Sequence, residues 1–254
     1  MLSTEKRRED ILAEIHSKGK VRVSELSKRY GISEVSIRKD LEHLEMQGQL
    51  SRVHGGAVGI GRLYVSMDLT ERFKTNSGSK KRLAKAIAAL IEDNDTIIMN
   101  SGTTLSYVLH ALEGKKNITI VTNSVQNAAE ASLISSFAVI LLGGEFESKY
   151  QFTYGEDALL QLENYHATKC ILSVDGISAD SGLTLFYSTE AALARKMTEC
   201  SGEVIVAADS SKVGRHAFAK ITDIRHSDTL VTNVDADREE ILKIEKLGVR
   251  VIRA

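Results

Sequence analysis

The first sixty positions place apolar residues at helical spacing between short polar breaks. Ile11 and Ile15 belong to the apolar stripe of a helix predicted over residues 5–17. Residues 21–23 then alternate between apolar and polar side chains, as in a short strand. The pattern therefore predicts a small mixed domain at the start of the chain.

Two further helices are predicted before residue 50. The earlier one runs from an N-cap at Ser24 through Tyr30, and Gly31 supplies the turn after it. Ser33 is expected to cap the later helix, which is predicted to end at Gly48. Two short helices joined by a Gly-containing turn are typical of a helix-turn-helix.

The later of these helices has one apolar stripe, with Ile37, Leu41 and Leu44 at i, i+4 and i+7. In a helix-turn-helix, such a helix enters the major groove of DNA with its first residues facing the base edges. The candidate DNA contacts near its N-terminus are Ser33, Glu34, Ser36, Arg38 and Lys39.

The segment "LSRVHGGAV" follows, with alternation and a Gly-Gly pair. This pattern suits a β-wing that places Arg52 and His54 near DNA phosphates. The alternative is a small helical bundle without a role in DNA binding. The Arg-Lys pair followed by a wing-like segment favours DNA binding. Asp40 is expected to hold the helix in place rather than to read bases.

Residues 59–79 are polar, dotted with Gly and Ser, and weakly periodic, so they are predicted to link two domains. Leu69 and Phe73 indicate a short helix within this linker. The predicted domains are a winged helix-turn-helix over residues 3–58 and a larger domain over residues 80–254.

The larger domain alternates short apolar runs with helical patterns. The predicted strands cover residues 96–100, 118–122, 137–142, 169–174, 203–208, 229–232 and 249–252. The predicted helices cover residues 80–91, 104–112, 125–133, 156–162, 190–200 and 237–247. Strand–helix alternation is typical of an α/β, Rossmann-like domain with a mainly parallel sheet covered on both faces.

Small, hydroxylated and Gly residues follow five of the predicted strands, and ligands of parallel sheets bind at those strand ends. Backbone N–H groups, short hydroxyl donors and helix N-termini suit phosphate and sugar hydroxyls. One such loop is an ordinary turn with an N-cap, but five in register favour a binding edge. The effector-binding candidates are Asn100, Ser101, Gly102, Thr103, Thr104, Asn123, Ser124, Gly143, Gly144, Asp175, Gly176 and Lys212.

The composition agrees with a packed protein, since the 254 residues are 43% hydrophobic and 26% charged. Residues 1–62 carry 12 Lys and Arg against 9 Asp and Glu, which is the sign that attracts nucleic acid. Two cysteines are too few for a disulfide framework, and Cys170 is predicted to be a buried thiol. No metal-ligand spacing, signal peptide or membrane span is recognised, so a cytoplasmic protein is expected.

The segment "SEVSIRKDLEHLEMQGQLSRVHGGA" resembles the N-terminal domain of the DeoR family of bacterial sugar-catabolism regulators. That family's helix usually reads Thr-Ile-Arg-Arg-Asp-Leu. Here Ser36 stands for the Thr and keeps its hydroxyl. Lys39 stands for the second Arg, and it keeps the charge but loses the bidentate fork.

The motifs "NSGTT", "VTNS", "LLGGE", "VDGIS…SGLT" and "AADSSKVG" resemble the DeoR-family sensor domain, in its order and spacing. The resemblance implies a fold shared with ribose-5-phosphate isomerase and a phosphorylated sugar as ligand. It implies that residues 101–104 hold the phosphate and that Asp175 and Lys212 reach the sugar. The family usually has Asp where Asn100 stands, which implies a different effector preference.

These observations predict a transcription repressor of a sugar or polyol catabolic operon, without a cofactor or a resident metal. A phosphorylated sugar or polyol would release it from double-stranded operator DNA. A homodimer or higher homo-oligomer is expected, because two heads on two half-sites multiply affinity.

The alternative is a sugar-phosphate isomerase or deaminase, with Asp175, Glu156 and Asp157 as candidate bases. A nucleotide-dependent kinase or dehydrogenase is disfavoured, because GxxxxGK[ST] and a full GxGxxG are missing. Gly59-Ile60-Gly61 is only a weak echo of the latter motif.

Overall fold

The computed structural model describes residues 3–18, 20–46, 50–58 and 69–254. The predicted helix end at Gly48, the Gly59-Ile60-Gly61 echo and the first ten residues of the predicted linker lie outside the described residues. The chain divides into two compact units, Met1–Met67 and Asp68–Ala254.

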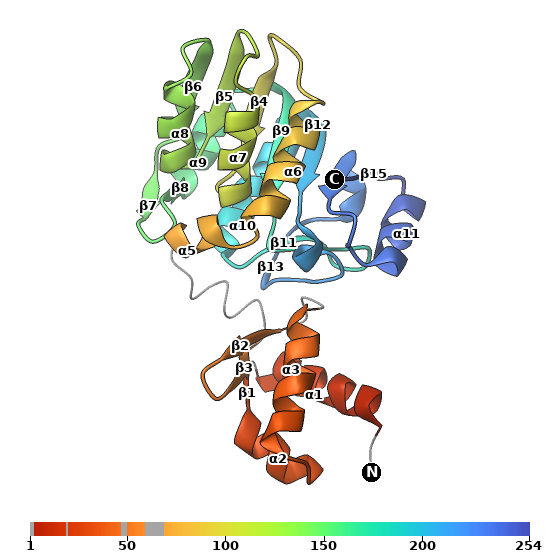
Figure 1. Ribbon diagram of the computed structural model, residues 1–254. Coiled ribbons are helices and arrows are strands. Elements are labelled where there is room, and N and C mark those ends of the chain that lie inside the picture. The colour runs from red at the N-terminus through yellow and green to blue at the C-terminus, as the bar shows by residue number, and fades with distance from the viewer. Residues whose placement is uncertain (1–2, 19, 47–49, 59–68) are drawn as a thin grey trace. The chain divides into compact units, whose positions relative to one another are not determined.

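The first unit is a winged helix-turn-helix, as predicted (Figure 1). Its elements are α1 (Thr4–Lys18), β1 (Lys20–Arg22), α2 (Val23–Tyr30), α3 (Glu34–Met46), β2 (Ser51–Val53) and β3 (Gly56–Val58). The three strands form one antiparallel sheet in the order β1-β3-β2. The predicted N-cap at Ser24 is wrong: Arg22 takes that place, because the Val23 N–H donates to the Gly55 carbonyl and strand pairing ends there.

A single apolar core joins the helices of this unit to its sheet. Ile11, Leu26, Ile37 and Leu41 are almost completely buried in it. At about 25 cal/mol per Å² of buried apolar surface, such side chains supply most of the stabilisation of a domain this small. The hydrophobic stripe read from the sequence is therefore the packing face of α3, and its opposite face stays exposed.

The second unit is built on a seven-stranded sheet in which every neighbouring pair is parallel. Its strands are β4 (Thr96–Met99), β5 (Ile118–Thr122), β6 (Phe137–Leu141), β9 (Ala167–Ser173), β12 (Ser201–Ala207), β14 (Thr229–Thr232) and β15 (Arg250–Arg253). These are the seven predicted strands, with each end within two residues of its predicted place. The mainly parallel, Rossmann-like fold is confirmed.

The strand order is β15-β14-β12-β9-β4-β5-β6. The chain starts at β4, builds outward through β5 and β6, and then returns to place β9 on the other side of β4. The sheet therefore changes its direction of growth between β4 and β9. Open α/β sheets bind ligands beyond the carboxyl ends of the strands at such a switch point.

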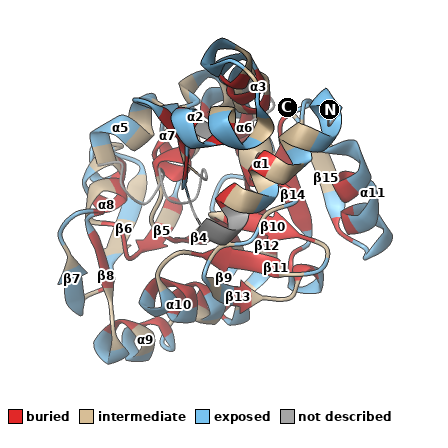
Figure 2. Ribbon diagram, turned by 90° about the horizontal axis from the view of Figure 1, so that it is seen from below, coloured by how far each residue is buried: buried red, intermediate tan, exposed pale blue. Residues whose placement is uncertain are grey.

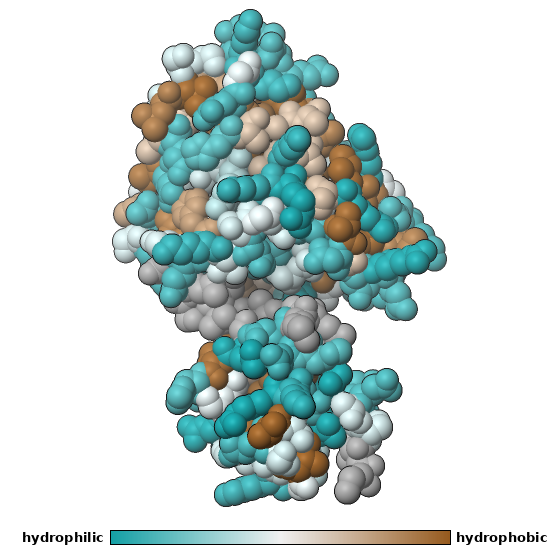
Figure 3. Space-filling view, viewed as in Figure 1, coloured by the Kyte–Doolittle hydropathy of each residue, from teal (hydrophilic) through white to brown (hydrophobic). Residues whose placement is uncertain are grey.

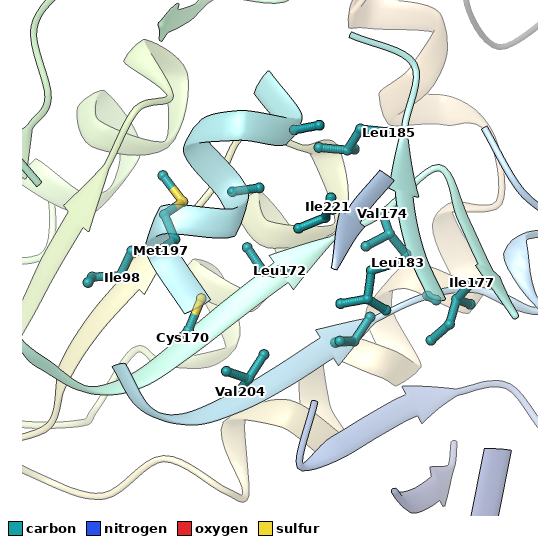
Figure 4. Packing of buried hydrophobic residues seen from close by; sticks show 14 of the residues in the cluster. Ile98, Cys170, Leu172, Val174, Ile177, Leu183, Leu185, Met197, Val204 and Ile221 are labelled. Atoms are coloured by element: carbon teal, nitrogen blue, oxygen red, sulfur yellow. The ribbon is translucent and has the colours of Figure 1, made fainter. Parts of the chain in front are cut away.

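Helices cover both faces of this sheet (Figures 1 and 2). They are α5 (Leu69–Lys74), α6 (Ser77–Ala88), α7 (Thr103–Ala111), α8 (Val125–Ser132), α9 (Glu156–Leu162), α10 (Ser188–Glu199) and α11 (Arg238–Lys246). Alternate residues of each strand enter separate cores. Ile97 and Met99 pack with α6 and α7, whereas Ile98 packs with α9 and α10. Figure 4 shows Met197 of α10 above Ile98 and Cys170.

Two small antiparallel sheets are formed by segments between the long strands, and the sequence did not predict them. They are β7 (Glu145–Glu147) with β8 (Phe152–Tyr154), and β10 (Gly176–Ser178) with β11 (Gly182–Leu185) and β13 (Ala219–Thr222). Two 3-10 turns, η1 (Ser210–Lys212) and η2 (Ile224–His226), accompany them. Strands of three or four residues are too short to show a clear period in the sequence.

The second unit begins at Asp68, so part of the predicted linker belongs to it. The short helix expected around Leu69 and Phe73 is present as α5, and α6 starts three residues earlier than predicted. None of the described helices is long and apolar enough to cross a membrane. Figure 3 shows hydrophilic side chains over most of the visible face, with apolar ones in small groups.

Candidate DNA-binding face and effector site

The N-terminus of α3 is capped as predicted, because Ser33 Oγ accepts the Ser36 N–H at 3.2 Å and lies 3.0 Å from Ser36 Oγ. Glu34, Arg38 and Lys39 are exposed there. The structure thus brings the five candidate DNA contacts of α3 together at the exposed start of that helix. Arg38 Nη2 donates to Glu34 Oε2 at 2.7 Å, one helical turn away.

The wing, formed by β2 and β3, carries the other two candidate DNA contacts. Arg52 donates from its backbone N–H and from Nε to the Glu45 carboxylate, at 2.8 and 2.7 Å. This pairing raises the pKa of Arg52 and lowers the pKa of Glu45. His54 is exposed in the turn before Gly55, whose φ of 79° favours glycine. Both candidate arginines are therefore already paired with a carboxylate of their own unit.

Asp40 is structural, as the sequence predicted. It is 2% exposed and accepts bonds from Arg7 Nε at 2.7 Å and Arg8 Nε at 2.9 Å. These pairs fix α1 against α3. A buried carboxylate that lost both partners would be costly, so the three side chains act as one unit.

In the second unit, Asn100 follows β4 at the switch point and is completely buried. Its Nδ2 donates to the Ser173 carbonyl at 3.0 Å, and its Oδ1 accepts the Ser173 N–H at 2.9 Å. The Asn100 carbonyl accepts from Asn127 Nδ2 at 3.3 Å. An ionised Asp could not donate to the Ser173 carbonyl. The amide therefore ties the ends of β4 and β9 together, a role that the sequence did not predict.

Residues 101–104 form the predicted turn into α7. Gly102 has a φ of 146°, and a Cβ there would lie 2.8 Å from the side chain of Ser173. Thr103 and Thr104 open the helix and are 4% and 6% exposed. Only glycine fits between this turn and β9. The first N–H groups of α7 have no partner within the helix and come four residues after the end of β4.

Lys80 reaches this turn from α6 and is 1% exposed. Its Nζ donates to Thr103 Oγ1 at 2.9 Å and to the carbonyl of Arg72. Burial lowers the pKa of Lys80 to about 8, the charges of Lys212 and Arg72 act in the same direction, and Asp209 opposes them. The sequence interpretation missed this residue, although Lys80 lies on the apolar stripe of α6 with Leu83 and Ile87.

Glu190 reaches the same turn from α10 and is 6% exposed. Its Oε1 accepts a hydrogen bond from the Ser101 hydroxyl. Burial raises the pKa of Glu190 to about 7 and the charge of Asp175 adds to the rise, whereas Ser101 and Arg72 oppose it. The sequence interpretation missed this residue as well, since acidic residues are common in the first turn of any helix.

The loops after β5 and β6 make mostly internal contacts. Ser124 Oγ caps α8 by accepting the Asn127 N–H at 3.2 Å. Asn123 Nδ2 donates to the Thr153 carbonyl at 2.9 Å, whereas Asn123 Oδ1 is buried and has no hydrogen-bond partner within the described part of the chain. The unmatched oxygen is a buried acceptor beside the predicted binding edge.

Gly143 and Gly144 follow the edge strand β6. The Gly143 N–H donates to Gln161 Oε1 at 2.9 Å. A Cβ at Gly144 would lie 2.4 Å from the Tyr154 carbonyl. Gly144 is therefore required by the close approach of β8, whereas a Cβ at Gly143 would meet only the end of the Gln161 side chain. The sheet order places them two strands away from β4, so they do not join the groups around Ser101.

Asp175 and Gly176 follow β9, next to β4. Asp175 Oδ2 accepts the Phe186 N–H at 3.0 Å. A Cβ at Gly176 would lie 2.7 Å from the Arg215 carbonyl, so the backbone of β10 passes close to residue 215. The pair thus positions the loop that carries Arg215 beside the end of β9.

Beyond β12, Asp209 is buried and accepts the Ser211 N–H at 2.9 Å, which fixes the short turn η1. Lys212 is 5% exposed in the same turn. Burial lowers the pKa of Arg215, and Asp209 opposes that shift. The electrostatic effects of Asp209 and Lys212 on Lys80 place η1 near α6.

The side chains at the ends of β4, β9 and β12 make one charged site. Its basic groups are Arg72, Lys80, Lys212 and Arg215, and its carboxylates are Asp175, Glu190 and Asp209. The Ser101 and Thr103 hydroxyls bond two of its members, Glu190 and Lys80. The chemistry of this set suits an anion that also carries hydroxyl groups, because buried cations need a counter-charge and carboxylates accept from hydroxyls. The described residues hold no cluster typical of a metal site.

Two family profiles match the chain. The DeoR-like helix-turn-helix domain matches residues 7–62, and the DeoR C terminal sensor domain matches residues 75–234. Together they cover most of the sequence, with one profile on each of the two units.

Full-length relatives are similar to this chain. A putative aga operon transcriptional repressor of Escherichia coli O157:H7 is 33% identical over 98% of this chain and 93% of its own length. The glycerol-3-phosphate regulon repressor of Escherichia coli K12 is 31% identical over 89% and 90%. Among solved structures, ribose 5-phosphate isomerase A of Neisseria gonorrhoeae is 17% identical, covers 52% of each chain and has a TM-score of 0.40.

Proposed function

The chain belongs to the DeoR family of transcription regulators, and from that premise we propose that it represses a sugar or polyol catabolic operon. A phosphorylated sugar or polyol is proposed to bind the second unit and to lower the affinity of the first unit for operator DNA. The observation that carries this proposal is the presence, in one chain, of a winged helix-turn-helix and a buried charged site at the switch point of a parallel sheet.

The first unit is proposed to bind DNA through the start of α3 and through the wing. Ser33, Glu34, Ser36, Arg38 and Lys39 would face the major groove, and Arg52 and His54 would lie near phosphates. The assignment is supported by the exposure of these residues, of which only Ser36 is half-buried. DNA phosphates would compete with Glu34 and Glu45 for the two arginines, so binding is expected to fall steeply with salt.

The effector site is proposed to lie at the ends of β4, β9 and β12. The phosphate would be held by the turn at residues 101–104 together with Lys80, and the sugar hydroxyls by Asp175, Glu190 and Lys212. Asn100 is proposed to position this turn through Ser173. Asn123 Oδ1 is a further acceptor toward the sugar, since it has no hydrogen-bond partner among the residues that the structure describes.

A thermal-shift screen with matched pairs tests the effector class. Glycerol 3-phosphate with glycerol and glucose 6-phosphate with glucose are two such pairs. A compound at 100 times its Kd stabilises the native state by about 2.7 kcal/mol. We expect at least one phosphorylated member of a wider panel to raise the Tm while its unphosphorylated partner does not. If no phosphorylated compound does so, the proposed effector class is wrong.

Fluorescence anisotropy tests the repressor assignment. The labelled duplex carries the region upstream of the gene, and a scrambled duplex of the same composition is the control. We expect preference for the upstream duplex and release when the stabilising compound is added. Equal affinity for both duplexes would contradict the assignment.

The protein is further proposed to act in the cytoplasm as a homodimer or higher homo-oligomer, with neither a cofactor nor a catalytic role. Two DNA-binding units in one oligomer, bound to the two half-sites of an operator, would bind more tightly than either unit alone. Analytical ultracentrifugation at micromolar concentration checks the assembly, and a monomer that binds the operator tightly would exclude it.

An isomerase or deaminase of sugar phosphates is the second candidate. The observation that favours it is Glu190, a buried carboxyl whose pKa of about 7 suits proton transfer beside a bound sugar. Of the three bases suggested by the sequence, Asp175 follows β9 at the proposed site, whereas Glu156 and Asp157 are exposed at the start of α9. Conversion of a bound sugar phosphate by the purified protein, abolished in Glu190→Gln, would establish this function.

A further inference from the structure

The helix α5 (Leu69–Lys74) is the first element of the second unit, and none of its six residues is buried. A helix this short is not stable by itself, and most helical stability comes from packing. The contacts that hold α5 to the rest of its unit therefore decide whether it stays in place.

Side chains near the charged site supply those contacts. Lys80 Nζ donates to the carbonyl of Arg72, and Tyr107 Oη donates to the carbonyl of Phe73 at 3.1 Å. The rings of Phe73 and Tyr107 lie 6.3 Å apart. Tyr107 stands one helical turn after Thr103 on α7, the helix that follows the proposed phosphate-binding turn, and Lys80 bonds that turn through Thr103.

Tyr150 is the third residue that holds α5, because the side chain of Arg72 lies over its ring. The guanidinium carbon of Arg72 is 4.1 Å from the centre of the Tyr150 ring. That ring packs 5.5 Å from Tyr187, the residue before α10 and three positions before Glu190. A guanidinium stacked on an aromatic face is attracted to the ring and held at one orientation.

Arg72 is also within electrostatic reach of both groups that bind the turn. Its charge repels that of Lys80, which bonds Thr103, and it attracts the carboxylate of Glu190, which bonds Ser101. An anion at residues 101–104 would neutralise the repulsion between the two cations. It would therefore favour the arrangement in which Arg72, and α5 with it, stays against the site.

We propose that Arg72 completes the phosphate-binding site, and that a bound phosphate holds α5 in place and so transmits occupancy to the chain that leads to the DNA-binding unit. The inference rests on the proposed function, since it needs a phosphorylated effector at residues 101–104. Segments with few buried contacts open at low free-energy cost, and a ligand that binds only the closed arrangement suppresses that opening.

Hydrogen–deuterium exchange of the full chain tests the proposal. The probes are the phosphorylated compound that raises the Tm and inorganic phosphate. One amide that reports on α5 is that of Thr75, directly after the helix, whose N–H donates to the Glu71 carbonyl at 3.0 Å. We expect the compound to slow exchange in the peptide covering residues 69–76 by roughly 5- to 150-fold, the usual range of coupling between linked sites.

Arg72→Ala is expected to abolish this slowing and to weaken effector binding, while Arg82→Ala is the matched control. Arg82 is exposed on α6 and bonds Ser79 within its own helix. Arg72→Lys keeps the charge and is expected to restore part of the affinity. Tyr107→Phe removes only the bond to Phe73, so α5 should exchange faster without effector and recover protection when effector is added.

Three results would count against the proposal, and they can be told apart. If the effector binds but α5 exchanges at an unchanged rate, the inference is wrong and the proposed function stands. If Arg72→Ala binds and protects like Arg82→Ala, Arg72 is not part of the site. If no phosphorylated compound stabilises the protein, the proposed function fails and the inference with it.

Discussion

Lys80 Nζ lies 2.9 Å from Thr103 Oγ1, so a buried cation of α6 meets the first residue of α7. The two residues are 23 positions apart in the sequence. This contact places a positive charge at a helix N-terminus, where the helix dipole is also positive. Two like charges at one point are unfavourable unless an anion joins them, which makes the contact the centre of the proposed phosphate site.

Lys80→Met is predicted to abolish effector binding while the protein stays folded. The variant replaces a buried cation by an apolar side chain of similar length, so the loss of the charge costs little stability. Lys81→Met, at an exposed position of the same helix, is the control. The thermal shift caused by the effector should vanish in Lys80→Met alone. In wild type, affinity should fall as pH rises through about 8, where Lys80 loses its proton.

Glu190→Gln is predicted to change the pH dependence of stability. Glu190 has a pKa of about 7 when folded against an ordinary value of 4.5, so the folded state binds the extra proton between these values. Its contribution to stability is present below about 4.5 and is lost as pH rises to about 7. The loss is on the order of 3 kcal/mol. Urea unfolding at several pH values should show this slope in wild type and a flatter one in the variant.

Asn100→Asp is predicted to destabilise the second unit by about 1–3 kcal/mol, because an ionised carboxylate cannot donate to the buried Ser173 carbonyl and would be desolvated. The midpoint of urea unfolding checks this prediction. Asn117→Asp is the control, since Asn117 is exposed and bonds only Asn94 among the residues described. Equal midpoints for the two variants would show that the hydrogen bonds between Asn100 and Ser173 do not contribute to stability.

Arg38→Ala is predicted to weaken binding to the upstream duplex by about tenfold, which corresponds to about 1.4 kcal/mol for a lost base contact. Arg225→Ala removes the same charge from an exposed pair in the second unit and should leave affinity unchanged. Fluorescence anisotropy against salt concentration measures both variants. Circular dichroism should show that the helices of Arg38→Ala are intact, because Arg38 is exposed.

Gly102→Ala is predicted to be more damaging than Gly114→Ala. Both glycines have positive φ, 146° and 99°, so both substitutions strain the backbone. Only at Gly102 would the new Cβ also lie 2.8 Å from Ser173, whereas nothing approaches Gly114 within 4 Å. Thermal denaturation should therefore show a lower Tm for Gly102→Ala. A similar Tm for both would mean that the turn can move away from β9 without cost.

Much of the fold could be predicted because its signals are local. The spacing of Ile37, Leu41 and Leu44 is enough to predict the buried face of α3, and the position of Ser33 predicts its N-cap. Central strands of the large sheet such as β4 are apolar on both faces, so they appear as continuous apolar runs between helices. The resemblance of the loop motifs to the DeoR sensor domain placed residues 101–104 in the candidate site.

The roles of the buried polar groups could not be read in the same way. Asn100 was expected to contact the effector, yet its amide bonds the backbone of Ser173 on the neighbouring strand. Gly143 and Gly144 belong to the same set of loop motifs, but the strand order puts them two strands from β4. The residue type determines which hydrogen bonds a side chain can make, whereas the partner that it bonds depends on which strand lies beside it.

The sequence by itself determined the two units, the order of their elements and the strand ends at which the effector site is proposed, since these follow from periodicity, capping and chain order. Only the tertiary structure decided that Arg72, Lys80 and Glu190 join that site. Their helices come from separate parts of the chain and meet because β9 returns beside β4. Burial among those helices then shifts the pKa values of Lys80 and Glu190, because desolvation depends on the packed neighbours and not on the sequence around each residue.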